Sequence, residues 1–171
     1  MKFSNALLLA LAMTTAIGHA AEDDFRQPVS VTADRSEGDL QSRTLSYLDN
    51  VVVVQGTLKI HADKLTLQSN EAQTEQIFVA TGNPATYEQM MDNGLMAEAE
   101  ASEIRYSVAK RELILTGEAE LRQDGSLVKG DRISYNALEQ KLTAKGSKQE
   151  QITTIFLPKT EDEAPKTEPT P

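Results

Sequence analysis

The side chains that could carry out catalysis are few, and the acidic ones follow a repeat. Four carboxylates occupy the polar positions that follow the small residue in four related segments, namely Asp34, Asp63, Glu103 and Asp131. Two carboxylates about 5 to 9.5 Å apart across a cleft would suit a glycosidase. Three of the four are followed directly by Lys or Arg, however, and acids that recur in every copy of a repeat are expected to be solvated or paired at the corners of a sheet. We therefore predict that the protein is not an enzyme.

Other kinds of catalytic centre lack their residue types. The sequence has no cysteine, and His61 is the only histidine after the first 20 residues. There is no Gly-x-Ser-x-Gly motif either, so neither a hydrolase triad nor a zinc site can be assembled. His61 lies between Ile60 and Ala62 in an alternating segment, and we expect it to point to solvent. We predict no metal site and no cofactor.

The repeat itself predicts how the chain is built. Each copy has a small residue, two polar residues, and then an apolar, a polar and an apolar residue, as in residues 62–67, 101–106 and 130–135, with a truncated copy at 33–35. This pattern indicates one strand-turn-strand unit used several times. In residues 58–67 the apolar positions change parity at Asp63 and Lys64, which predicts a bulge or corner where the strand passes from one sheet to another. The same shift recurs in the other copies.

The rest of the chain supports an all-β fold. Short alternating segments are separated by turn residues every 6 to 12 positions, with turns expected at Asp49-Asn50 and at 81–84. A dozen or more short strands without a long helix predict an antiparallel sandwich or jelly roll. Pro28 precedes an alternating segment at 29–33, which we expect to be an edge strand because proline donates nothing to a ladder. A second strand is expected over 40–47.

Composition divides the chain into three parts. Residues 1–20 combine Lys2, an apolar run and a small-residue cleavage site, which predicts a signal peptide removed after Ala20. Residues 21–158 form the predicted β-domain, and residues 159–171 a disordered acidic and proline-containing tail. The formal charge of -9 argues against binding to nucleic acid. An apolar inner face of the sheets is the remaining candidate for function, and composition leaves open whether it is a packed core or a groove for an apolar ligand.

Several blocks resemble the OstA family of lipopolysaccharide-transport proteins. They are Gln27 to Asp34, Val51 to Leu67, Asn83-Pro84-Ala85-Thr86-Tyr87 followed by Asp92-Asn93-Gly94, and Val128 to Tyr135, and they occur in this order over nearly the whole predicted domain. The resemblance implies a twisted antiparallel β-jelly roll with an open apolar interior groove. It further implies a periplasmic protein of Gram-negative bacteria that contributes to outer-membrane assembly by shielding the acyl chains of lipid A.

The resemblance also implies partners and site residues. The chain would receive lipopolysaccharide from LptC, pass it to the amino-terminal domain of LptD, and stack head to tail with copies of itself. Positions on the inner face, expected to contact lipid, are Val29, Val31, Leu40, Leu58, Ile60, Tyr87, Ile104, Tyr106 and Val108. Positions on two edge strands, expected to contact partners, are Val29, Ser30, Val31, Thr32, Ile152, Thr153, Thr154 and Ile155. The alternative is a structural adaptor that links envelope proteins without carrying lipid, and it predicts a packed interior.

Overall fold

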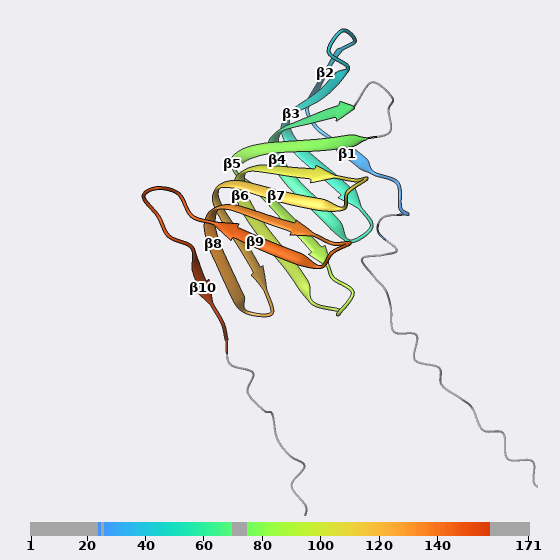
Figure 1. The fold of residues 1–171 in the computed structure, drawn as a ribbon. Helices are drawn as coiled ribbons and strands as arrows, with labels where there is room; N and C mark the ends of the chain where they lie inside the picture. Colours follow the sequence, from blue (N-terminus) through green and yellow to red (C-terminus); the bar gives the residue numbers. More distant parts are fainter. Residues whose placement is uncertain (1–23, 25, 70–74, 158–171) are drawn as a thin grey trace, which may run out of the picture.

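Ten antiparallel strands make up the described part of the computed structural model, which covers residues 24, 26–69 and 75–157 (Figure 1). In chain order they are β1 (Ser30–Thr32), β2 (Arg35–Asp39), β3 (Thr44–Gln55), β4 (Leu58–Ser69), β5 (Gln76–Met90), β6 (Met96–Ser107), β7 (Glu112–Gln123), β8 (Ser126–Asn136), β9 (Lys141–Lys145) and β10 (Thr153–Ile155). The predicted signal peptide and the predicted tail lie outside the described residues. Within those residues, no helix is long and apolar enough to cross a membrane.

The six strands β3 to β8 are long, with 11 to 15 residues each, and the ladders between them change register near the middle. Between β4 and β5 the shift falls after His61 and before Lys64. The same strand buries Leu58 and Ile60 before the shift and Leu65 after it. The predicted corner at Asp63 and Lys64 is thereby confirmed, and the shifts between the later strands confirm that it recurs.

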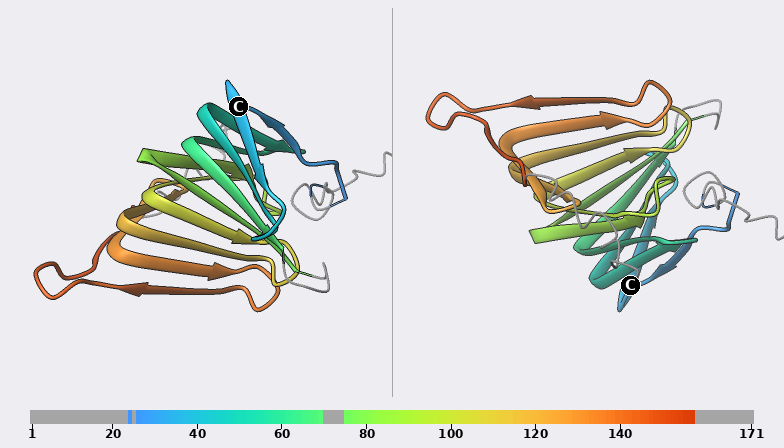
Figure 2. Two further views of the ribbon diagram at one scale, coloured as in Figure 1. Left: turned by 90° about the horizontal axis from the view of Figure 1, so that it is seen from above. Right: turned by 90° about the horizontal axis from the view of Figure 1, so that it is seen from below.

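The corners divide the sheet into two halves that fold over one another. Half-sheet I consists of β1, residues 51–55, 58–62, 85–90, 96–101, 119–123 and 126–130, and β10. Half-sheet II consists of β2, residues 44–48, 64–69, 76–81, 103–107, 112–116 and 132–136, and β9. In Figure 2 the strands fan out from the N-terminal to the C-terminal end of the molecule, which shows the twist of the sheet. The expected all-β jelly roll is confirmed.

Two expected turns are corners instead. Asp49 and Asn50 have φ values of 64° and 48°, yet the chain does not reverse there, and β3 continues from one half-sheet into the other. Residues 81–84 likewise lie inside β5. Both predictions were wrong for one reason: left-handed backbone and glycine mark a hairpin turn and a corner equally well. The described residues therefore form fewer and longer strands than the dozen or more expected.

The strand expected over residues 40–47 corresponds to β3, and it begins later than the sequence suggested. Leu40 was expected to start it and to face inward, but it lies in the turn between β2 and β3, with 95% of its surface exposed. The side chain of Asp39 stabilises that turn by accepting hydrogen bonds from the backbone N–H groups of Gln41 and Ser42, at 2.8 and 3.1 Å. β3 then starts at Thr44. The inner-face assignment of Leu40 was therefore wrong.

Candidate functional site

The facing surfaces of the two half-sheets form an apolar interior. Successive Cα partners across half-sheet I place five side chains in one row, namely Val53, Ile60, Tyr87, Ala99 and Leu121. In half-sheet II the equivalent row nearest the strand ends contains Leu67, Phe78, Tyr106, Leu113, Tyr135 and Leu142. Side chains paired in this way lie about 5 Å apart, so each row is a continuous apolar strip. Most members of both rows are buried or packed against the core.

Packing is tight beside the corners. One row of Cα partners across half-sheet II has almost no exposed surface. In order across the strands it consists of Leu65, Ala80, Ile104, Leu115 and Ile133. Interiors packed in this way hold few voids larger than a water molecule. The interior is therefore a dry core along the line of corners.

Away from the corners the interior opens into two adjoining cavities of about 250 Å³ each. Both lie between the β5–β6 turn of half-sheet I and the end of β8 in half-sheet II, and both are lined by Tyr87, Met91, Leu113 and Tyr135. Ala97, Leu121 and Leu142 complete the apolar wall of the first cavity. Tyr106 lines the second. We call these two cavities together the groove.

Apart from Leu40 and Val29, the predicted inner-face residues fall into three groups. Tyr87 and Tyr106 line the groove. Leu58, Ile60 and Ile104 belong to the buried core, and Val31 and Val108 are partly buried and packed against it.

Val29 differs from these residues because it precedes β1, with 38% of its surface exposed. The contact of these positions with lipid remains a prediction.

Sequence reasoning missed several groove residues, of which a stricter use of the repeat would have found one. Tyr135 stands in its copy of the repeat where Tyr106 stands in the preceding one. The register shows why they belong together, since Leu113 is the Cα partner of both. Leu121, Leu142 and Met91 carry no comparable signal. Their place in the groove depends on which strands become neighbours.

A buried polar network closes the groove near the N-terminus. Asp24 is only 4% exposed, and its carboxylate accepts hydrogen bonds from the Thr57 backbone N–H at 2.7 Å, the Thr57 hydroxyl at 2.5 Å and the Gln89 side-chain amide at 2.9 Å. The Tyr87 hydroxyl donates to the Gln89 carbonyl oxygen. We call this set of four residues the clasp.

Glycine makes the clasp possible. Gly56 has a φ of +60°, and a Cβ atom there would lie 1.9 Å from the Asp24 carboxylate oxygen. Any side chain at this position would therefore displace Asp24. The Gln55 side chain adds a further tie by donating to the backbone carbonyl of Gln27 at 3.1 Å. The segment before β1 is thus fixed to the end of half-sheet I.

Burial keeps the groove tyrosines neutral. It raises the pKa of Tyr106 to about 12, and it also raises the pKa values of Tyr87 and Tyr135, since a phenolate loses solvation inside the fold. All three hydroxyls therefore keep their protons and can donate hydrogen bonds. The groove combines these apolar and phenolic walls with charged side chains, because Asp92 lines both cavities and Arg111 lines the second.

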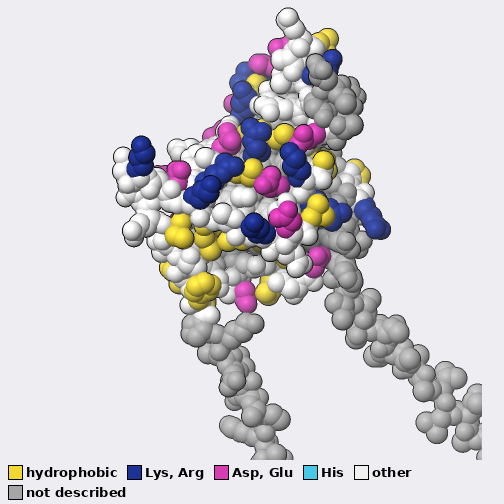
Figure 3. All heavy atoms as spheres, in the orientation of Figure 1, with side chains coloured by type: hydrophobic (Ala, Val, Ile, Leu, Met, Phe, Trp, Pro, Cys, Tyr) yellow, Lys and Arg dark blue, Asp and Glu magenta, His cyan; other side chains and the backbone are white. Residues whose placement is uncertain are grey.

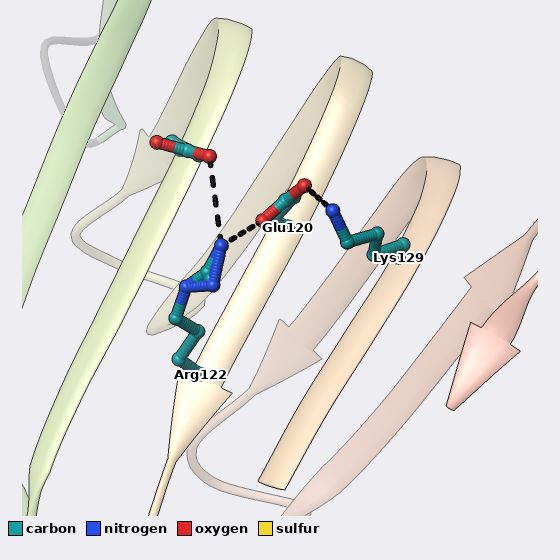
Figure 4. A network of polar contacts seen from close by, with 4 residues as sticks. Glu120, Arg122 and Lys129 are labelled. Carbon is teal, nitrogen blue, oxygen red and sulfur yellow. Dashed lines mark hydrogen bonds and ion pairs between the residues drawn. The ribbon is translucent and has the colours of Figure 1, made fainter. Parts of the chain in front are cut away.

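The outer face of half-sheet I is polar. Glu120 on β7 pairs with Arg122 and with Lys129 of β8, and Arg122 also lies 3.9 Å from Glu100 of β6 (Figure 4). The hydrogen bond from Lys129 holds the pKa of Glu120 below its usual value. Over the face seen in Figure 3, basic and acidic side chains are interspersed. The sheet is therefore apolar inside and charged outside.

The four repeated carboxylates lie at corners and not across a cleft. Asp63, Glu103 and Asp131 belong to β4, β6 and β8, so one strand separates each from the next. Two strand spacings amount to about 9.5 Å, at the upper end of the range for a catalytic pair. Asp34 accepts a hydrogen bond from the Asn50 side chain at 2.7 Å. His61 is exposed, as expected, and no group of His, Asp or Glu among the described residues could hold a metal ion.

Comparison with known proteins gives a consistent result. A family model described as "LptA/(LptD N-terminal domain) LPS transport protein" matches residues 30–141. The chain is 37% identical to the lipopolysaccharide export system protein LptA of Escherichia coli K12, over 92% of this chain and 90% of that protein. It is 30% identical to the lipopolysaccharide export system protein LptH of Pseudomonas aeruginosa, over 90% of each.

A solved structure shows the same fold. The crystal structure of LptH from Pseudomonas aeruginosa, described as the LptA-homologous periplasmic component of the lipopolysaccharide transport device, superposes with a TM-score of 0.71. The match covers 80% of this chain and 99% of the LptH chain, at 26% sequence identity.

Proposed function

The chain belongs to the LptA/(LptD N-terminal domain) family of lipopolysaccharide-transport proteins, and from this membership we propose that it shields the acyl chains of lipopolysaccharide in the groove. In this role it helps to carry the lipid from the inner to the outer membrane. The observation that carries the proposal is the groove itself, because a packed adaptor would have no use for apolar cavities between its sheets.

Hydrophobic transfer supplies the driving force. Each buried methylene contributes about 0.8 kcal/mol, so exposing an acyl chain of a dozen carbons to water would cost roughly 10 kcal/mol. A continuous apolar strip lets a chain move along the groove without that exposure. The sugars and phosphates can stay in solvent beside the charged outer surface.

Assembly into a bridge follows from the sheet edges. In the described part of the chain, β1 and β10 are the terminal strands of half-sheet I, and β2 and β9 those of half-sheet II. Each half-sheet contains eight antiparallel strands, and an even number makes its first and last strands run in opposite directions. A second copy stacked head to tail would continue both ladders as antiparallel pairs.

The same edges are proposed to contact the neighbouring proteins of the bridge, LptC at one end and the amino-terminal domain of LptD at the other. Val29 to Thr32 supply one edge and Ile152 to Ile155 the other, of which Ser30–Thr32 and Thr153–Ile155 form strands. The bridge would stand in the periplasm, which the chain would reach through the predicted signal peptide. Family resemblance and unpaired strand edges support this assignment.

Photo-crosslinking in intact Gram-negative cells tests whether the groove holds lipid. Leu142 lines the groove and is 43% exposed, so a photoreactive amino acid can replace it without disturbing the core. We expect a lipopolysaccharide adduct from position 142. Thr143 is the matched control, because neighbouring residues of a strand point to opposite faces.

An adduct at 142 with none at 143 would support the proposal. Equal labelling at both positions would indicate contact with lipid on the surface only. If position 142 yields only protein adducts in a folded protein, the shielding role fails and the adaptor returns as the better explanation.

A further inference from the structure

Tyr106 carries a buried polar group that the packing leaves unsatisfied. Its side chain is 7% exposed and lines the second cavity of the groove, and its hydroxyl has no hydrogen-bond partner among the described residues. Such groups are uncommon in folded proteins. Burying a hydroxyl without a partner costs about 1 to 3 kcal/mol, so the position calls for an explanation.

The surroundings show that this hydroxyl differs from its neighbour. The Tyr87 hydroxyl, which belongs to the same cavity wall, donates to Gln89, and the Gln89 amide in turn donates to Asp24. That chain of hydrogen bonds is complete and ends at a carboxylate. Tyr106 takes no part in it.

The protonation state decides what the hydroxyl can offer. Burial raises the pKa of Tyr106 to about 12, so the group is a neutral phenol at physiological pH. A neutral phenol can donate one hydrogen bond, and it can therefore meet an acceptor oxygen that enters the cavity with the ligand. A pure hydrocarbon chain would leave this donor as unsatisfied as it is without ligand.

We propose that the Tyr106 hydroxyl donates a hydrogen bond to an oxygen carried by the acyl part of the bound lipid, which is an ester or amide carbonyl or a hydroxyl on the chain. The inference rests on the proposed function, since it takes the groove as the acyl-chain site. It makes Tyr106 a specificity residue that favours acyl chains bearing an oxygen over plain apolar molecules. It also gives the sliding lipid one preferred stopping position, where the donor and acceptor meet.

Ligand binding to Tyr106→Phe tests this role. The substitution removes one oxygen atom and keeps the ring. We expect affinity for lipopolysaccharide and for 3-hydroxytetradecanoate to fall by about three- to tenfold, the range of one net hydrogen bond. Affinity for the apolar dye N-phenyl-1-naphthylamine, which has no oxygen, should not change. Tyr47→Phe, which removes the same atom from a tyrosine that lines neither cavity, is the matched control and should leave all three affinities nearly unchanged.

Stability of the lipid-free protein provides a second measurement. Because the hydroxyl lacks a partner, Tyr106→Phe should leave the urea midpoint unchanged or raise it, whereas Tyr87→Phe should lower it by removing the donor to Gln89. A lowered midpoint for Tyr106→Phe would show that a water already satisfies the hydroxyl, and it would overturn the inference.

The outcomes separate the two proposals. If the unmodified protein binds neither lipopolysaccharide nor the dye, the proposed function fails. If it binds both, and Tyr106→Phe binds lipopolysaccharide equally well or Tyr47→Phe is equally impaired, only the inference about Tyr106 fails.

Discussion

At the scale of single residues, Asp24 shows how one carboxylate fixes a whole segment. It lies before the first strand, yet it supplies the acceptor for three donors on Thr57 and Gln89. Charge-assisted hydrogen bonds of this kind are stronger than those between neutral groups. The clasp therefore holds the entry to β1 in place, although β1 itself has only three residues.

Replacing this carboxylate tests the clasp. Asp24→Ala would leave buried donors on Thr57 and Gln89 without an acceptor, and we expect the free energy of unfolding to fall by about 1 to 3 kcal/mol. Urea titration followed by far-ultraviolet circular dichroism would measure the change. Asp63→Ala, at an exposed corner of β4, is the control and should remain within about 0.5 kcal/mol of the unmodified protein. Equal midpoints for both variants would show that the clasp does not stabilise the fold.

At the scale of the strand, the corners decide the architecture. Gly117 and Glu118 have φ values of 78° and 50°, and β7 changes half-sheets at that point. A Cβ atom on Gly117 would lie 2.9 Å from the Ser102 hydroxyl on the corner of β6. Neighbouring corners thus pack closely against each other (we call this the nesting of the corners). The corner of β7 therefore needs a residue without a side chain where it meets Ser102 of β6.

The corner glycine can be tested by substitution. Gly117→Ala would place a Cβ in left-handed backbone and against Ser102, so we expect a loss of about 1 to 2 kcal/mol in the free energy of unfolding. Gly38→Ala is the matched control, because Gly38 lacks a positive φ and its added Cβ would meet only Leu45, at 3.9 Å. Thermal unfolding of the two variants under one set of conditions would compare them. A Gly117→Ala protein as stable as Gly38→Ala would refute the nesting of the corners.

At the scale of the whole molecule, the sheet ends without closing. The exposed hydrophobic side chains include Ile155, Phe156 and Leu157, at or just after the edge strand β10. In Figure 3 hydrophobic side chains gather where Figure 1 places β10. Unpaired backbone groups together with apolar side chains make this edge suitable for pairing with another chain.

A proline in that edge should block assembly without affecting the groove. Thr154→Pro removes a backbone N–H from a strand of three residues, and we expect it to lower the average mass of the protein in solution at high concentration. Light scattering after size-exclusion chromatography would measure the mass. Lys148→Pro, in the loop before β10, is the control and should assemble normally. Assembly of Thr154→Pro to the same mass would exclude β10 as the pairing edge.

Local pattern was sufficient for much of this fold. The change of parity at Asp63 and Lys64 predicted a corner, and Pro28 predicted that the following strand lies at an edge. Both signals are local, because the period of a strand and the lost donor of a proline act on neighbouring residues. The pairing of Val31 with Val53 then shows where that edge lies.

The sequence was not sufficient to predict the structure where one local pattern is compatible with two different backbone paths. Asp49 and Asn50 take the backbone of a hairpin turn, but the chain crosses there into the other half-sheet. Leu40 looked like the start of a strand because it is apolar, yet Asp39 fixes a turn around it. In each case the outcome depends on distant partners that no local pattern contains.

The sequence by itself determined the strand periodicity, the repeated corners, the absence of cysteine chemistry and the family, because each of these depends on residue types and their spacing. Only the tertiary structure decided that the interior is packed beside the corners and hollow near the strand ends. It also brought Asp24 to Gln89, and it placed Tyr106 beside a cavity without a partner. These features arise from contacts between residues far apart in the chain, and such contacts form only when the two half-sheets close on each other.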